Sequence, residues 1–98
     1  MKEGEPEKRP LFSLGQTVAT PGALEALEQA EESPLAYLQR HVTGDWGDLP
    51  EEDIQENQFS LENDLRIFSA YHLPTGSKIW VITEWDRSVT TILLPSEY

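Results

Sequence analysis

The sequence contains no cysteine, few basic residues and no long apolar run. Without cysteine there is no disulfide, no thiolate zinc site and no cysteine nucleophile, which favours a reducing compartment. Only four of the seven Lys and Arg residues follow residue 10, so a broad basic surface for nucleic acid is not expected. No apolar stretch approaches the roughly 20 residues that span a bilayer, and residues 1–10 lack the apolar core of a signal peptide. We therefore expect a cytoplasmic protein that does not enter a membrane.

Negative charge is concentrated in the middle of the chain. The formal net charge is −11, and residues 21–64 hold twelve acidic residues and one base, Arg40. Such a block repels polyphosphate and suits a basic protein surface. In the extreme it would mimic DNA, which requires the carboxylates to form a row on one face. The alternative is a solvated helical surface that keeps a small protein soluble.

The length and the order of the elements predict one α+β domain in residues 11–98. Residues 1–10 are rich in charge and proline and are expected to form a disordered leader. Residues 11–19 are expected to form a strand, with Phe12, Leu14 and Val18 on one face.

Two helices and a shorter third are predicted after that strand. Thr20-Pro21 and Ser33-Pro34 each combine an N-cap residue with a proline at the first helical position. Pro50 is followed by three acids, which the helix dipole favours in a first turn. Apolar support for this third helix is thin, so we expect it to be short.

The last third of the chain predicts a three-stranded antiparallel meander, with strands at 65–72, 78–84 and 89–94. Asn63-Asp64 marks the turn before it, and Pro95 ends its last strand. Apolar residues occur on both faces, so the helices are expected to cover one face and leave the other partly covered. The predicted order is β-α-α-(α)-β-β-β, with two or three helices on a sheet of three to four strands. If strand 65–72 or 89–94 lies at an exposed edge, a homodimer by strand pairing is a further hypothesis.

Two segments resemble a family of small bacterial "plasmid-related" proteins. They are RHVTGDWGD at residues 40–48, and the stretch from KIWVITE at residues 78–84 to DRSVTTILLP at residues 86–95. The resemblance implies a setting on a plasmid or other mobile element and no defined chemistry. In outline the chain is also similar to barnase/EndoU/RelE-like ribonucleases, which place helices before an antiparallel sheet.

That outline motivates one catalytic hypothesis, a metal-independent ribonuclease. His41 would be the general acid–base, and Arg66 or Arg87 would stabilise the charge that develops. Tyr98, Thr90 or Thr91 would hold a phosphate. The opposing hypothesis is a small acidic interaction or regulatory protein that binds a basic partner. Convergence of His41, Arg66, Arg87 and Tyr98 on one cleft would favour the enzyme.

Other candidate sites have structural alternatives. His41, Asp45 and Asp48 could bind a divalent ion, or the two carboxylates could cap turns beside a histidine on a helix flank. Trp46 and Trp85 could stack on a ligand, or cover the edge of the core. No cofactor motif is present, and neither a cofactor nor a metal is expected.

Overall fold

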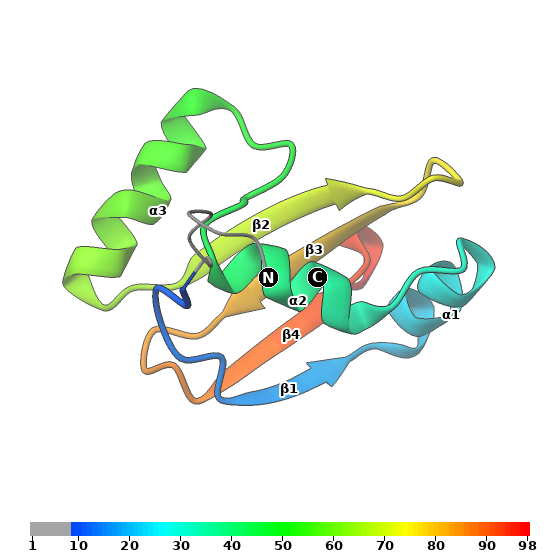
Figure 1. The fold of residues 1–98 in the computed structure, drawn as a ribbon, viewed down its shortest axis with the longest axis horizontal. Coiled ribbons are helices and arrows are strands. Elements are labelled where there is room, and N and C mark those ends of the chain that lie inside the picture. The colour runs from blue at the N-terminus through cyan, green and yellow to red at the C-terminus, as the bar shows by residue number, and fades with distance from the viewer. Residues whose placement is uncertain (1–8) are drawn as a thin grey trace, which may run out of the picture.

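Three helices and a four-stranded sheet make up the computed structural model, which describes residues 9–98 (Figure 1). The elements in chain order are β1 (Gln16–Ala19), α1 (Pro21–Gln29), α2 (Pro34–Val42), α3 (Glu51–Asn63), β2 (Ile67–His72), β3 (Lys78–Thr83), β4 (Val89–Leu93) and the 3-10 helix η1 (Pro95–Glu97). The predicted α+β class and element order are confirmed. Residues 1–8 of the predicted leader lie outside the described residues.

The sheet has the strand order β1-β4-β3-β2. β2, β3 and β4 form the predicted antiparallel meander, in which Thr83 pairs with Ile67 on one side and Thr90 on the other. β1 joins β4 in parallel, with Thr17 opposite Thr90. A parallel pair needs a long crossover connection, and here all three helices and two strands separate β1 from β4.

The first strand is shorter than the sequence predicts. The expectation of a strand over residues 11–19 is wrong for its first half, since β1 begins at Gln16. Gly15 has φ +66° and lies so close to the chain at Ser88 that an added Cβ would be 2.4 Å from the Ser88 carbonyl carbon. This close approach turns the chain, so Phe12 leaves the sheet and packs against His41, at 5.3 Å between ring centroids.

The two proline-initiated helices begin where the sequence predicts. The Thr20 hydroxyl accepts a hydrogen bond from the Ala23 N–H at 3.2 Å, and the Ser33 hydroxyl accepts from the Leu35 N–H at 3.1 Å. Each cap satisfies a backbone donor that has no partner within the helix. Figure 1 shows α1 and α3 at opposite ends of the sheet, with α2 crossing its face between them.

The third helix is not short. With 13 residues α3 is the longest of the three helices in the described part of the chain, and the expectation of a short helix is wrong. Its buried residues are polar, Asn57 and Ser60. α3 has no apolar stripe, so hydrogen bonds to other elements, rather than apolar packing, hold this helix against the sheet. It ends at Asp64, whose left-handed φ of 54° confirms the predicted turn.

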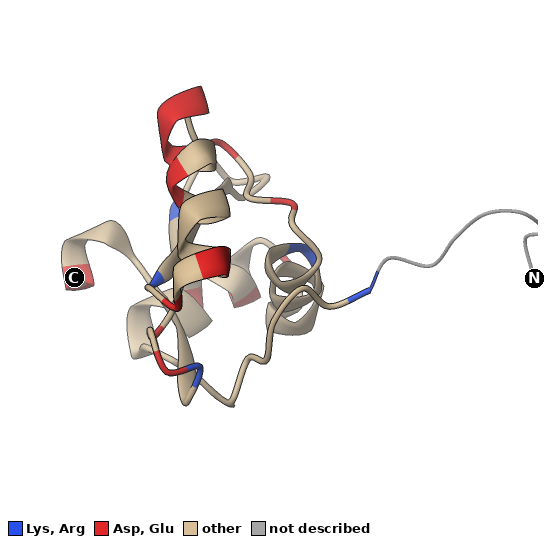
Figure 2. Cartoon of the chain, turned by 90° about the vertical axis from the view of Figure 1, so that its left-hand side faces the viewer, with Lys and Arg blue, Asp and Glu red and all other residues tan. Residues whose placement is uncertain are grey.

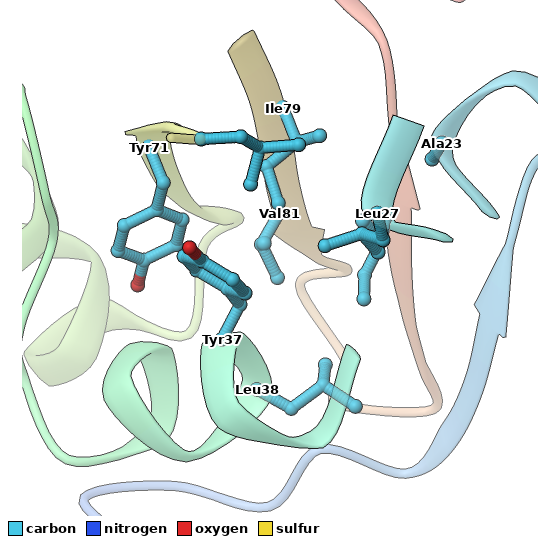
Figure 3. Close-up of a cluster of buried hydrophobic side chains, with 9 residues drawn as sticks. Ala23, Leu27, Tyr37, Leu38, Tyr71, Ile79 and Val81 are labelled. Carbon is cyan, nitrogen blue, oxygen red and sulfur yellow. The ribbon is translucent and has the colours of Figure 1, made fainter. Parts of the chain in front are cut away.

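The core lies between α1, α2 and one face of the sheet, here called the inner face. Leu27 and Leu38 pack against Ile79, Val81 and their neighbours (Figure 3). Tyr37 and Tyr71 meet at 5.2 Å between ring centroids. Among the described residues, no helix has the length and apolar character needed to cross a membrane.

Candidate functional site

His41 is completely buried on the inner face of the sheet. Its Nδ1 lies 2.5 Å from the Ser69 hydroxyl, and its Nε2 lies 3.0 Å from the Thr83 hydroxyl. The rings of Phe12 and Trp46 pack against it, with centroids at 5.3 and 5.9 Å. Both ring nitrogens are therefore occupied by side chains of the core.

The hydrogen-bond chain around His41 fixes which nitrogen carries the proton. Thr90 donates its hydroxyl proton to the Leu14 carbonyl oxygen at 2.7 Å, so it accepts from Thr83, at 2.6 Å. Thr83 in turn accepts from Nε2–H of His41, and Nδ1 accepts from Ser69. Burial lowers the pKa of His41 to about 3, so the ring is neutral at pH 7. A buried neutral ring with two fixed partners is poorly suited to shuttling protons for a substrate.

Arg87 holds loops together by binding backbone carbonyls. Its Nη1 donates to the carbonyl oxygens of Leu65, Glu84 and Trp85 at 2.7–3.0 Å, and its Nη2 donates to that of Ser60 at 3.1 Å. The guanidinium thus ties the end of α3 to the turn between β3 and β4.

Arg66 and Tyr98 lie together on the opposite face of the sheet, here called the outer face. Nη1 of Arg66 donates to the Tyr98 hydroxyl at 3.1 Å, and Nη2 pairs with Glu84 at 3.2 Å. His41 contacts Ser69, whose side chain points to the inner face, since successive strand residues alternate. The four residues of the ribonuclease hypothesis therefore do not converge, because the sheet separates His41 from Arg66 and Tyr98.

The three residues of the metal hypothesis also have separate partners. Asp45 pairs with Arg40 at 2.7 Å, and Asp48 lies 2.6 Å from Nδ1 of His72. No group of three or more metal-ligating side chains occurs within residues 9–98.

The two loop tryptophans have different environments. Trp46 is 6% exposed and stacks on Phe12, with 6.4 Å between centroids, as the core-edge alternative predicts. Trp85 is 60% exposed in the turn between β3 and β4.

A concave surface lies on the outer face of the sheet. Phe68, Trp80 and Tyr98 form an aromatic row, with centroids 5.1 Å apart for the first pair and 5.7 Å for the second. With Arg66 and Ile82 these rings line a hollow of about 270 Å³. We call this hollow and its extension toward α3 the outer groove.

One wall of the outer groove is acidic. A second hollow of about 520 Å³ shares Arg66 and Phe68 with the first and extends to Glu52, Asp53 and Glu56 of α3. Figure 2 shows acidic positions, in red, along the helix that faces the viewer, which is α3. Three carboxylates and the single guanidinium of Arg66 line this hollow, so the charge of its lining is negative.

The twelve acids of residues 21–64 do not form one row. Those of α1 and those of α3 lie on helices at opposite ends of the sheet (Figure 1). Mimicry of DNA needs a quasi-regular row on one face, and this division does not provide one.

The strands named in the homodimer hypothesis offer no free edge. β4 is inside the sheet, between β1 and β3. β2 is an edge strand, but the Asn57 side chain binds the Phe68 backbone at both N–H and C=O, at 3.2 and 2.7 Å. Ala70 donates its N–H to the Trp46 carbonyl at 3.1 Å and accepts from the Asp48 N–H at 2.7 Å. The edge of β2 is therefore occupied by the chain itself.

Sequence reasoning missed the outer groove as a site. The available signal was the spacing of two residues between Arg66 and Phe68, which places them on one face, and the alternation of Trp80 with Ile79 and Val81, which places its ring on the face away from the helices. That Tyr98 reaches the same place follows from η1, which folds the chain back onto β3.

No family model matches the chain, and no curated protein or solved structure matches it.

Proposed function

We propose that this protein is a non-catalytic interaction protein that binds a basic protein segment in the outer groove. The observation that carries the proposal is the continuity of an aromatic floor with an acidic wall, joined at Arg66 and Phe68. Cations bind over aromatic faces, and carboxylates at the rim steer and hold them. A segment with Lys or Arg side chains would satisfy both parts of the groove.

The cellular location of the protein and its association with a mobile element are part of the same proposal. A cysteine-free composition supports a cytoplasmic protein, and the resemblance of residues 40–48 and 78–95 supports an association with a plasmid or other mobile element. The protein would act as a regulator of the basic partner by binding it in the groove.

The test uses a fluorescein-labelled peptide of alternating lysine and glycine, with alternating glutamate and glycine as the control. Anisotropy is measured with the wild-type chain and with the variant Glu52→Gln, Asp53→Asn, Glu56→Gln. The matched control is Glu51→Gln, Glu62→Gln, Asp64→Asn, which removes the same charge from residues of α3 and its cap that do not line the groove.

The groove variant is expected to weaken binding about tenfold, which corresponds to roughly 1.4 kcal/mol. The control variant is expected to change it by less than about threefold, the size of a screened surface effect. An equal loss of affinity in both variants would show that the peptide binds by general charge attraction. No loss of affinity in either variant would refute the groove as the site.

A further inference from the structure

The edge of the sheet formed by β1 has no hydrogen-bonding partner in the described chain. Gln16 and Thr20 donate their N–H groups to the carbonyls of Ser88 and Ile92 at 2.9 Å, which fixes the side of the strand that faces β4. Thr17 and Ala19 alternate with these residues, so their N–H and C=O groups point away from β4. Among the hydrogen bonds that residues 9–98 make outside the regular helix and strand pairs, none involves the backbone of Thr17 or Ala19.

β1 is short, with four residues, but it lacks the other features that protect edge strands. Those features are charged residues, proline, bulges or a covering segment. The strand Gln-Thr-Val-Ala has no charge and no proline, and its first three residues are exposed. Val18 is 41% exposed on the outer face.

An apolar cavity lies beside this edge on the inner side. The cavity has a volume of about 250 Å³ and lies where β1 faces α1 and α2. It is lined by Thr17, Val18, Ala19, Leu24, Pro34, Leu38 and Ile92. Leu24 is 48% exposed there. A strand added to β1 would place alternate side chains over this cavity.

Acidic residues of α1 and of the turn after it lie close in sequence to two lining residues of the cavity, Leu24 and Pro34. Glu28 is one helical turn from Leu24, and Glu31 stands at the left-handed position that ends α1, three residues before Pro34. α1 has no basic residue in its last turn. A second copy of this chain is disfavoured as the occupant, because two molecules of net charge −11 repel each other.

We infer that β1 is a docking edge for an extended segment of a basic partner protein, which adds a fifth strand to the sheet. The segment supplies main-chain hydrogen bonds to Thr17 and Ala19, an apolar side chain for the cavity, and Lys or Arg at its ends for the acidic residues of α1 and the turn after it. This surface shares no lining residue with the outer groove, so the inference does not rest on the proposed function.

The experiment uses the full chain labelled with 15N and the peptide Lys-Thr-Val-Thr-Leu-Thr-Lys, acetylated and amidated. Two further peptides test charge and main-chain hydrogen bonds separately. In one, glutamate replaces both lysines. The other is N-methylated at alternate residues, so one of its edges has no N–H donors. The amide resonances of Thr17 and Ala19 are followed by NMR, together with their exchange with solvent.

Both amides are expected to shift and to become protected with the lysine peptide, while Phe68 and Ala70 do not change. The glutamate peptide should bind at least about tenfold more weakly, and the N-methylated peptide should not bind. Leu24→Gln is expected to weaken binding about tenfold, since it removes an apolar wall of the cavity. Leu35→Gln is the matched control, because Leu35 is 69% exposed and does not line the cavity, and it should change binding less than about twofold.

Three results would overturn the inference. The first is no change at Thr17 and Ala19 with the lysine peptide at millimolar concentration. The second is equal binding of the N-methylated peptide. The third is protection of these amides that rises with protein concentration in the absence of peptide, which would make a second copy the occupant.

Discussion

The two edges of the sheet differ in how their backbone groups are satisfied. At the β2 edge a helix side chain and a loop bind the outward-facing groups of Phe68 and Ala70. At the β1 edge the equivalent groups of Thr17 and Ala19 have no partner in the described chain. The chain thus closes one edge with its own residues and leaves the other open.

The closed edge explains several residues that look unremarkable in the sequence. Asp48 lies between Gly47 and the helix α3, and its carboxylate accepts from His72 at the end of β2. The pKa of Asp48 is lowered, first by this hydrogen bond with the His72 ring and also by the His72 backbone N–H. Asn57, Gly47 and Asp48 therefore act together to occupy the edge.

The largest expected effect comes from opening the β2 edge with Asn57→Ala. Asn57 is 3% exposed, and the change leaves the N–H and C=O of Phe68 without their partner. We expect the free energy of unfolding to fall by about 2–4 kcal/mol in urea denaturation, because buried backbone groups lose their hydrogen bonds.

The control for that variant is Asn63→Ala. Asn63 is exposed and donates only to the Phe59 carbonyl of its own helix, so the expected loss is below about 1 kcal/mol. Equal losses for the two asparagines would contradict the role of Asn57 at the edge.

The second variant is Gly47→Ala, which pushes the closing loop away from β2. Gly47 has φ +78°, and an added Cβ would lie 2.0 Å from the Ala70 carbonyl oxygen. We expect a loss of about 2 kcal/mol or more in the free energy of unfolding, because the clash is with the backbone of Ala70, which cannot move aside as a flexible side chain can.

Gly76→Ala provides the comparison for Gly47. Gly76 also has a positive φ, +97°, but nothing lies within 4 Å of the added Cβ. Only the conformational strain remains there, about 1 kcal/mol. A loss at Gly76 as large as that at Gly47 would show that strain alone, without contact to Ala70, accounts for the effect.

Acid is expected to weaken the sheet through His41, which lies beneath β2 and β3. The pKa of the folded form is about 3, below the ordinary value of 6.5, so the unfolded chain binds a proton that the folded chain excludes. The stability is therefore fully present above pH 6.5 and falls as the pH drops toward 3, by about 1.4 kcal/mol per pH unit.

Denaturation curves between pH 7 and pH 5 check this slope, in a range above the titration of most carboxylates. The variant His41→Gln should be less stable at pH 7, because it loses the packing and hydrogen bonds of the ring, and it should lose the additional slope. A wild-type slope equal to that of the variant would contradict the burial of His41 as a neutral ring.

The smallest effect is expected for Thr17→Pro at the open edge. Proline removes an N–H that has no partner in the described chain, so the free energy of unfolding should change by less than about 1 kcal/mol. Ala70→Pro removes the N–H that donates to Trp46 and should be far more damaging. Similar losses in the two proline variants would contradict the difference between the edges.

The meander and the helix starts could be predicted from the sequence because their signals are local. Strand alternation, the turn at Asp64 and the caps at Thr20 and Ser33 each depend on neighbouring residues. The parallel pairing of β1 with β4 could not be predicted in this way, since it joins Thr17 to Thr90 across most of the chain.

The candidate sites depended more strongly on tertiary structure. His41 has the residue type of an acid–base catalyst, but its burial against Ser69 and Thr83 could not be read from the helix that carries it. The length of α3 was underestimated because Asn57 stabilises it through Phe68, which lies beyond the helix. Propensity and periodicity do not record such contacts.

The most direct test of the difference between the edges is native-state hydrogen exchange of single backbone amides in the free protein. We predict that Phe68 and Ala70 exchange only through opening of the structure, as core strands do. Thr17 and Ala19 should exchange close to the rate of an unstructured chain, while Gln16 and Val18, which face β4, are protected. Protection of Thr17 and Ala19 equal to that of Gln16 and Val18 would contradict the open edge.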